Sequence, residues 1–356
     1  MFELISETGT VLSVILILMA CIYLLVLAIL IIRLTQQIAE TRQKNFIERY
    51  EHIIFEYLGE EQRPVDVIKL FPVSNYKHLL NYLRGHLLSL KGNDWKKLAR
   101  LVNETRLYDY LLKQLNSRLK KKIIFGAYFI GLAKSENAKF ILKKNLKHKN
   151  RMVFLACALS LARINDVDSL NLILNRSAKF KNLSRDTLLS IIYEFKDSVC
   201  ERLVKRLENE KSLFFESIII SALGYFKYSP AASHILPVLI KAESDELVLE
   251  SLRYFREIEY LDASTAIRFC LLNSNPDIKV EAIRAAERIG VSVLEERIWA
   301  LIFDTERRVK ITAAEAMYNF SDFSRKKLKQ LAYSIPDTKE SSIARMIVSE
   351  KTIHPN

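Results

Sequence analysis

The stretch NPDIKVEAIRAAERIG, residues 275–290, decides the fold, because both ends of one helix are encoded within it. Asn275 is a favourable N-cap residue, and Pro276 takes the first helical position, where its missing N–H is not needed. Three alanines share one face, where a second helix can approach closely. Gly290 then ends the helix. The stretch predicts a short, capped helix with a buried face of small residues.

Comparable helices recur along the chain at nearly constant spacing. If Ile289 is taken as the reference residue, the equivalent positions lie 31 or 32 residues apart, at Leu132, Ile164, Phe195, Phe226, Ile258, Ile289 and Phe320. Mostly apolar or small residues lie three, four and seven positions before each of them, which is the pattern of a buried helix face. Seven copies at this regularity predict a repeat protein.

A second helix lies between successive copies. Nine residues after the reference residue, six copies have Ile or Val, and the seventh has Lys329 in a lysine-rich stretch that suits a solvated terminal repeat. Each unit therefore has two helices in about 31 residues. Neither helix can bury its face alone, so the units must stack. The sequence predicts an all-α protein with a right-handed α-solenoid of about seven two-helix repeats.

The helix at residues 277–290, DIKVEAIRAAERIG, resembles the pattern D-x-x-V-R-x-x-A-x-x-A-L-x-x-x-G of short, PBS-lyase-type HEAT-like repeats. The helix at residues 307–320, RRVKITAAEAMYNF, keeps part of this pattern and lacks the glycine. The resemblance covers residues 116–334. It implies a solenoid and says little about function, because solenoids serve many purposes.

The N-terminal part contains one segment long enough to cross a membrane. Residues 11–32 form a run of 22 residues without a charge, and a transmembrane helix needs about 20. Glu3 and Glu7 precede the run, whereas a cleaved signal peptide would have a basic start. A lipoprotein cleavage box is also disfavoured, because Cys21 lies in the middle of the run. We expect an uncleaved, single-pass anchor.

Basic residues follow the apolar run, beginning with Arg33 and Arg42. The positive-inside rule then places the N-terminus outside and the solenoid in the cytoplasm, with the anchor in a bacterial inner membrane. The predicted division of the chain is a short extracytoplasmic N-terminus (1–10), a transmembrane helix (11–32), a helical membrane-proximal spacer or cap (33–115), the HEAT-like solenoid (116–335) and a C-terminal tail (336–356).

This layout also resembles a group of bacterial proteins that combine one N-terminal span, a short helical region and HEAT-like repeats. Those proteins are associated with membrane glycosyltransferases of exopolysaccharide systems. The resemblance implies a protein partner that is itself membrane-bound, such as a synthase.

Most of the formal net charge of +13 lies between Lys113 and Arg151, where twelve Lys or Arg face one acid. We name as the basic segment Lys113, Arg118, Lys120, Lys121, Lys122, Lys139, Lys143, Lys144, Lys147, Lys149 and Arg151. Three interpretations stay open: solvated helix faces, attraction to anionic lipid headgroups, and contacts with nucleic-acid phosphates. A membrane tether makes the nucleic-acid interpretation the less economical one.

A second set of polar residues lies on the outward side of the repeated helices. We name as the inner ridge Arg163, Tyr193, Tyr225, Arg253, Arg256, Arg284, Arg288 and Tyr318. Tyr and Arg are enriched among the residues that dominate protein–protein binding, so the ridge is the candidate partner surface. The alternative is a solvated face with i,i+4 pairs such as Arg253–Glu257, in which Arg284–Arg288 would be an unfavourable pair unless an acid lies between them.

Signatures of catalysis or metal binding are missing from the sequence. The six histidines show no HxxxH or HExxH spacing, the four cysteines lie more than forty residues apart, and no phosphate-binding glycine loop occurs. We therefore expect no enzyme, metal or cofactor, and predict a membrane-anchored scaffold or adaptor that binds a protein. A basic solenoid that binds nucleic acid at the membrane is the alternative. A tetrapyrrole lyase of the HEAT-like type would need an acidic or thiol site for which the sequence offers no candidate.

Overall fold

The computed structural model describes residues 2–60, 62–181, 183–241, 244–333 and 338–353, and gives no side chains for residues 2–18 and 39. Throughout these ranges the secondary structure is helical, without strands. The chain divides into two compact units, Met1–Ala138 and Lys139–Asn356. Unit 1 contains the apolar run, and unit 2 contains most of the repeats.

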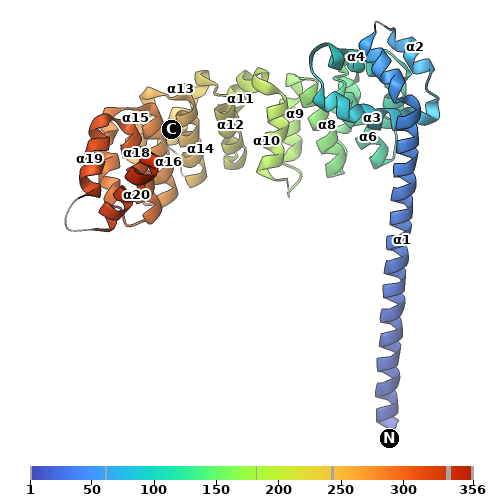
Figure 1. Ribbon diagram of the computed structural model, residues 1–356, viewed down its shortest axis with the longest axis horizontal. Coiled ribbons are helices and arrows are strands. Elements are labelled where there is room, and N and C mark those ends of the chain that lie inside the picture. Colours follow the sequence, from blue (N-terminus) through green and yellow to red (C-terminus); the bar gives the residue numbers. More distant parts are fainter. Residues whose placement is uncertain (1, 61, 182, 242–243, 334–337, 354–356) are drawn as a thin grey trace. The chain divides into compact units, whose positions relative to one another are not determined.

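The first helix of unit 1, α1 (Phe2–Gly59), is continuous. The predicted transmembrane helix (11–32) and the first part of the predicted spacer (33–115) form this one helix, because neither Gly nor Pro occurs between Gly9 and Gly59 to interrupt it. The large apolar side chains from Met19 to Ile38 are exposed, whereas Phe46, Ile54 and Tyr57 in the last part of the helix are buried. The mean hydropathy of an 18-residue window in this helix reaches 2.2. By length and composition the helix could cross a membrane. It extends away from the other helices of unit 1 (Figure 1).

The remaining helices of unit 1 form a small helical bundle around the end of α1. They are α2 (Pro64–Lys69), η1 (Val73–Asn75), α3 (Tyr76–Ser89), α4 (Gly92–Asn103), α5 (Arg106–Leu115), α6 (Lys120–Leu132) and η2 (Glu136–Ala138). Pro64 starts α2 and Pro72 precedes η1, so each proline lies at a helix boundary. α4 and α5 are separate helices, because the Thr105 side chain accepts a hydrogen bond from Leu107 N and caps α5.

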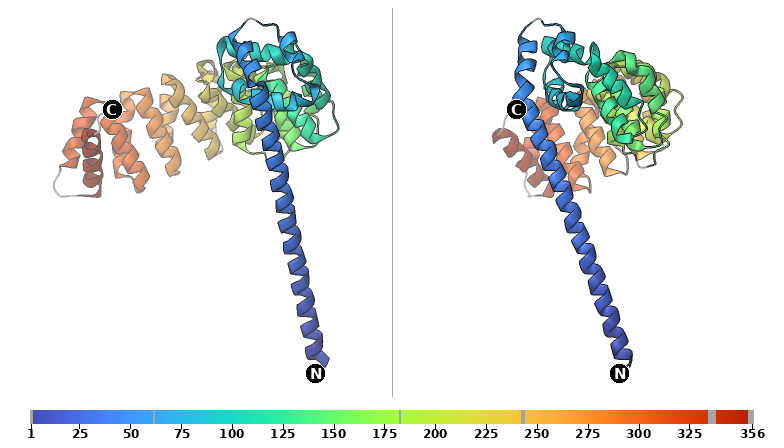
Figure 2. Two further views of the ribbon diagram at one scale, coloured as in Figure 1. Left: turned by 45° about the vertical axis from the view of Figure 1, so that its right-hand side comes forward. Right: turned by 90° about the vertical axis from the view of Figure 1, so that its right-hand side faces the viewer.

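Unit 2 stacks helix pairs in chain order (Figures 1 and 2). Its inner helices pack side by side: α8 (Arg151–Arg163), α10 (Arg185–Glu194), α12 (Leu213–Tyr225), α14 (Asp245–Ile258), α16 (Pro276–Ile289) and α18 (Arg307–Phe320). Its outer helices mostly pack on the inner helix that follows: α7 (Lys139–Asn145), α9 (Leu170–Ser177), α11 (Cys200–Leu207), α13 (Ala232–Lys241), α15 (Ser264–Cys270), α17 (Glu295–Ala300) and α19 (Asp322–Ala332). This is the architecture of a HEAT-like α-solenoid.

Short 3₁₀ turns join the inner helices to the outer ones. They are η3 (Val167–Ser169), η4 (Lys196–Val199), η5 (Ser229–Ala231), η6 (Leu261–Ala263) and η7 (Ser292–Leu294), and η8 (Leu301–Phe303) extends α17.

The backbone conformation at the ends of the inner helices also shows the repeat. A left-handed residue follows six successive inner helices, with φ angles of 49° to 72°, at Lys134, Asn165, Lys196, Lys227, Glu259 and Gly290. These positions are 31 or 32 residues apart and confirm the repeat. They also move the first reference residue from Leu132 to Ala133. Gly290 is the one copy in which the residue type suits this conformation without a Cβ penalty.

Side-chain N-caps form in some of the repeats, including the one predicted at Asn275. Asn150 and Asn275 accept hydrogen bonds from the first turns of α8 and α16. Ser212 and Ser244 precede α12 and α14 and make no such bond. α10 begins later than the spacing predicts, and Ser184 caps it by accepting from Thr187 N.

The segment 336–356, expected as a tail, contains α20 (Lys339–Ile353), which packs against α18 and α19. Its Ala344, Ile347 and Val348 are buried. They lie seven, four and three residues before Lys351, which is 31 residues after Phe320. The pair α19–α20 is therefore one more repeat, and α20 rather than the lysine-rich α19 closes the stack.

Candidate partner-binding surface

The inner ridge is organised around a buried carboxylate. Glu281 of α16 has a side chain that is only 6% exposed, and Arg256 of α14 forms an ion pair with it. Arg253 Nε lies 3.7 Å from Glu281 Oε2, and Arg284 Nη1 lies 3.9 Å from the same atom. A carboxylate leaves water at acceptable cost only when cations and hydrogen bonds compensate it. Glu281 therefore holds three arginines of the ridge together across two neighbouring helices.

A second buried carboxylate extends this arrangement. The Glu250 side chain, 4% exposed, lies 2.6 Å from Arg253 and 2.9 Å from Arg185 of α10. Arg253 thus bridges both glutamates, and the predicted Arg253–Glu257 pair is wrong. Glu257 instead lies 3.3 Å from Arg256 and 3.6 Å from Lys227. Arg253 pairs with Glu250, three residues before it, because that carboxylate is already fixed in the interior.

The remaining arginines of the ridge also meet acids of neighbouring repeats. Arg288 lies 2.8 Å from Glu259, and Arg163 lies 3.5 Å from Glu194. Arg284 and Arg288, a like-charge pair by sequence, are thus each compensated by a different carboxylate. The arginines of the ridge are therefore neutralised by glutamates and do not form a surface of uncompensated positive charge. Each guanidinium has five N–H donors, so donors are left over for a partner after these pairings.

An aromatic pair lies at the centre of unit 2. Tyr193 of α10 and Tyr225 of α12 stack with their ring centroids 3.9 Å apart and an interplanar angle of 23°. Tyr225 is 62% exposed, whereas Tyr193 is half-buried, and burial raises the pKa of Tyr193. Tyr318 lies apart from this pair, with the Arg325 guanidinium 5.0 Å from its ring centroid. The structure thus brings Arg253, Arg256 and Arg284 into one cluster and Tyr193 and Tyr225 into a second, and places Tyr318 in neither.

Three residues of this network are absent from the sequence-based candidates: Glu250, Glu281 and Arg185. The sequence did contain a signal for the two glutamates, which is their shared position in the repeat. Glu250 lies eight residues before the reference residue Ile258, and Glu281 lies eight residues before Ile289. A repeated acid at one register position among arginines indicates a buried ion-pair network.

The basic segment is divided between the two units. In unit 1, Lys120, Lys121 and Lys122 form the exposed first turn of α6, which has no acidic residue. In unit 2, most of its members are exposed where α7 connects to α8, at Lys144, Lys147, Lys149 and Arg151. Lys143 differs, because its Nζ lies 2.8 Å from the buried Asp166 and so supports the fold.

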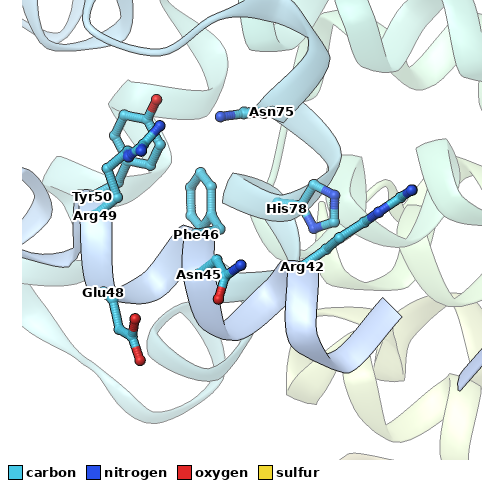
Figure 3. Close-up of a pocket in the computed structure, with 8 residues that line it drawn as sticks. All are labelled: Arg42, Asn45, Phe46, Glu48, Arg49, Tyr50, Asn75 and His78. Atoms are coloured by element: carbon cyan, nitrogen blue, oxygen red, sulfur yellow. The ribbon is translucent and has the colours of Figure 1, made fainter. Parts of the chain in front are cut away.

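Unit 1 contains an open cavity of about 610 Å³ between α1 and α3 (Figure 3). It is lined by Arg42, Asn45, Phe46, Glu48, Arg49, Tyr50, Asn75 and His78. The His78 ring packs on Phe46 at a centroid distance of 6.1 Å, and its Nδ1 lies 3.1 Å from Gln43 Oε1. Burial, with help from Lys77 and Arg42, lowers the pKa of His78. Two guanidinium groups suit a small anion, although Glu48 opposes it.

Metal chemistry finds no support in the part of the chain that the structure describes, where no group of three or more His, Cys, Asp or Glu could hold an ion. Cys157, Cys200 and Cys270 are buried and unpaired, and burial raises the pKa of each thiol. They are therefore packing residues and poor nucleophiles.

No protein-family model and no curated protein matches the chain. Among solved structures, 49 chains match. The complex of CpcE and CpcF of phycocyanin lyase from Nostoc sp. PCC7120 is 14% identical with a TM-score of 0.35, over 58% of this chain and 74% of that chain. A designed armadillo repeat protein in complex with the peptide (KR)4 is 14% identical with a TM-score of 0.34, over 60% and 98%. Human deoxyhypusine hydroxylase is 16% identical with a TM-score of 0.30, over 77% and 96%.

Proposed function

We propose that this protein is a membrane-anchored scaffold whose inner helices bind a protein partner. The observation that carries the proposal is the stacked pair Tyr193–Tyr225 next to the arginine network on Glu250 and Glu281. Tyrosine and arginine are the side chains that most often dominate binding energy at interfaces. Here the chain itself holds them in place.

Preorganisation strengthens this argument. Ordering a flexible side chain at an interface costs roughly 0.5–1.5 kcal/mol, and an arginine already fixed by a buried carboxylate has met part of that cost before binding. Arg253, Arg256 and Arg284 are fixed in this way by Glu281. Tyr225 is held by its stacking on Tyr193 and still exposes most of its ring.

The apolar part of α1 is the proposed anchor, crossing a bacterial inner membrane once. Its side chains are exposed from Met19 onward, and apolar side chains arranged around a whole helix favour a lipid environment. By the positive-inside rule, Arg33 and the basic residues after it favour an N-terminus outside and a solenoid in the cytoplasm. A partner reached from this position would be membrane-associated, and a membrane-bound synthase such as a glycosyltransferase fits. The proposal assigns no catalysis to the chain.

The ridge is tested by Tyr225→Ala, with Tyr333→Ala as the matched control, since Tyr333 is similarly exposed at 70% and lies at the end of α19. The full chain is purified from its own membranes, and the proteins recovered with it are quantified. A binding hot spot is worth about 2 kcal/mol or more, so Tyr225→Ala should lower recovery of the partner roughly 30-fold. Equal recovery with both variants would contradict the proposal.

Simultaneous removal of Arg253, Arg256, Arg284 and Arg288 is a less specific test. It would leave Glu250 with Arg185 alone and Glu281 without a cation, which would destabilise unit 2. Loss of binding would then not distinguish a damaged surface from a damaged fold.

Nucleic-acid binding is the second candidate, and the basic segment favours it. Phosphate contacts made by Lys and Arg weaken steeply as salt increases. A salt-dependent gel shift of DNA or RNA by the detergent-solubilised full chain would support it. Absence of a shift at low salt would end it.

A further inference from the structure

The two edges of the solenoid in unit 2 differ in charge. Successive inner helices run in the same direction, so the ends of the outer helices and the starts of the inner helices that follow them lie along one edge (Figure 2). We call this the outer-to-inner edge. The return connections form the opposite edge.

At the first two connections of the outer-to-inner edge, bases far outnumber acids. Lys147 and Lys149 lie between α7 and α8, and Arg151 begins α8; Lys179 and Lys181 lie between α9 and α10. All five are exposed. The return connections of the same repeats carry Asp166, Asp168 and Asp197 with Lys196, and Asp166 pairs with Lys143 and Asp168 with Arg202, so these connections are close to neutral. The charge contrast between the edges is therefore built into the same two repeats.

Large apolar side chains follow along the outer-to-inner edge. Fourteen residues after the reference residue in three successive repeats lie Ile240, Leu272 and Phe303, with 66%, 60% and 53% exposure. Leu213 and Phe214 are exposed one connection earlier. The same register position is thus apolar and exposed three times in succession.

Acids do occur at these later connections, and the chain itself engages Asp245, Asp277 and Asp304. Asp277 lies 2.9 Å from Arg308, and Asp304 lies 2.6 Å from Lys279. Asp245 accepts a hydrogen bond of 2.7 Å from Asn275. Burial raises the pKa of Asp304, but the hydrogen bonds from the Lys279 side chain and from Glu306 N outweigh it, so the net effect lowers this pKa.

Apolar exposure alone does not distinguish the edges. Leu261 and Val293, at 63% and 66%, are exposed on the opposite edge. There they stand beside Glu259, Asp262 and Glu295. The charges beside these side chains differ between the edges: acids flank Leu261 and Val293, whereas the outer-to-inner edge carries five exposed bases at its first two connections. Bases together with exposed apolar side chains suit an anionic lipid surface.

We propose that the outer-to-inner edge of unit 2 lies on an anionic lipid bilayer, with the lysines at the headgroups and Ile240, Leu272 and Phe303 entering between them. The proposal rests on the membrane anchoring proposed above. It means that the solenoid lies along the membrane and leaves the inner ridge beside the surface, available to a membrane-bound partner.

The test places a fluorescent label at Ile240→Cys or at Val293→Cys in the full chain with Cys21→Ala. The two positions are equally exposed, at 66%, on opposite edges. The chain is reconstituted in vesicles of phosphatidylcholine alone or mixed with phosphatidylglycerol, each with a headgroup-attached nitroxide quencher. We expect quenching at position 240, stronger with phosphatidylglycerol, and little at position 293.

A charge variant completes the test. Each well-placed basic residue contributes about 1 kcal/mol at an anionic surface, so Lys179→Gln with Lys181→Gln should lower the docking equilibrium roughly 30-fold. Both residues are exposed, so the fold should survive. Equal quenching at positions 240 and 293, or no effect of phosphatidylglycerol, would overturn the proposal. Shielding of position 240 from an aqueous quencher without lipid quenching would also overturn it, in favour of a protein covering the edge.

Failure of the anchor would look different. If α1 does not insert, the chain is extracted from phosphatidylcholine vesicles by alkaline carbonate, whatever the label at position 240 reports. If the chain resists extraction and the label reports no lipid contact, the anchor stands and the edge proposal fails.

Discussion

The substitution Glu281→Gln tests the network that organises the inner ridge. Glutamine keeps the shape of the side chain and removes the charge that Arg253, Arg256 and Arg284 share. We expect unit 2 to lose stability, because three guanidinium groups then lack their common counter-ion. The variant also separates the network from packing, since volume hardly changes.

The magnitude follows from burial. Removing one member of a buried ion pair costs about 3–5 kcal/mol when the partner is left buried and uncompensated. Here the arginines are 28% to 52% exposed and can turn to water, so we expect about 2 kcal/mol. Glu257→Gln is the matched control: its carboxylate is 38% exposed, and we expect about 0.5 kcal/mol.

The two tryptophans allow the measurement to be confined to unit 2. Trp299 lies in α17, and Trp95 lies in α4 of unit 1. In a Trp95→Phe background, urea unfolding in detergent is followed by Trp299 fluorescence. A loss of about 2 kcal/mol lowers the midpoint by about 1 M when the urea dependence is about 2 kcal/mol per M. An unchanged midpoint for Glu281→Gln would refute the network as a stabilising element.

Gly126→Ala should destabilise unit 1 by about 1–3 kcal/mol, because a Cβ would lie 3.0 Å from backbone atoms of α5. Gly85→Ala has open space around it and should stabilise α3 by about 1 kcal/mol. Urea unfolding followed by tryptophan fluorescence tests both, and equal effects on stability would contradict the packing. Burial raises the pKa of Cys157 to about 12, so iodoacetamide should modify the exposed Cys21 in detergent and leave Cys157 unmodified until urea is added. Mass spectrometry measures both modifications, and rapid modification of Cys157 in the folded chain would contradict its burial. The pKa of His78 is lowered, so its NMR titration should have a midpoint below 6.5. The stability that the neutral ring contributes should be fully present above pH 6.5 and should decline as the pH falls below that value. A titration midpoint above 6.5 would contradict the buried, cation-flanked environment.

Spacing predicted the repeats well, because each inner helix buries the same three positions. It missed α20, because Lys351 stands where other copies have an apolar residue, although Ala344, Ile347 and Val348 keep the buried pattern. A long helical side chain at the end of the stack can reach solvent, so the reference position tolerates a charge there. The interior positions of the pattern are thus better markers of a terminal repeat than its last position.

The continuity of α1 was also missed, for a different reason. Hydropathy changes after Ile32, whereas helix formation depends on the absence of Gly and Pro, which holds to Gly59. A change in environment along a chain is therefore not a helix boundary.

The ridge illustrates what spacing cannot provide. Its arginines and tyrosines were predicted from their positions on the repeated helices. Their partners depend on how far neighbouring helices are rotated against one another, which brings Arg253 to Glu250 and Glu281 and Tyr225 onto Tyr193. Long side chains select among several carboxylates within reach, and only the packed structure fixes that selection.

The central claim is that the inner helices bind a protein, and site-specific photo-crosslinking in native membranes tests it most directly. Benzoylphenylalanine replaces Tyr225 in one sample and Tyr333 in the other, two similarly exposed tyrosines, at 62% and 70%. We predict one discrete crosslinked product from position 225 and none from position 333. The same products from both positions, or none from position 225, would contradict the account.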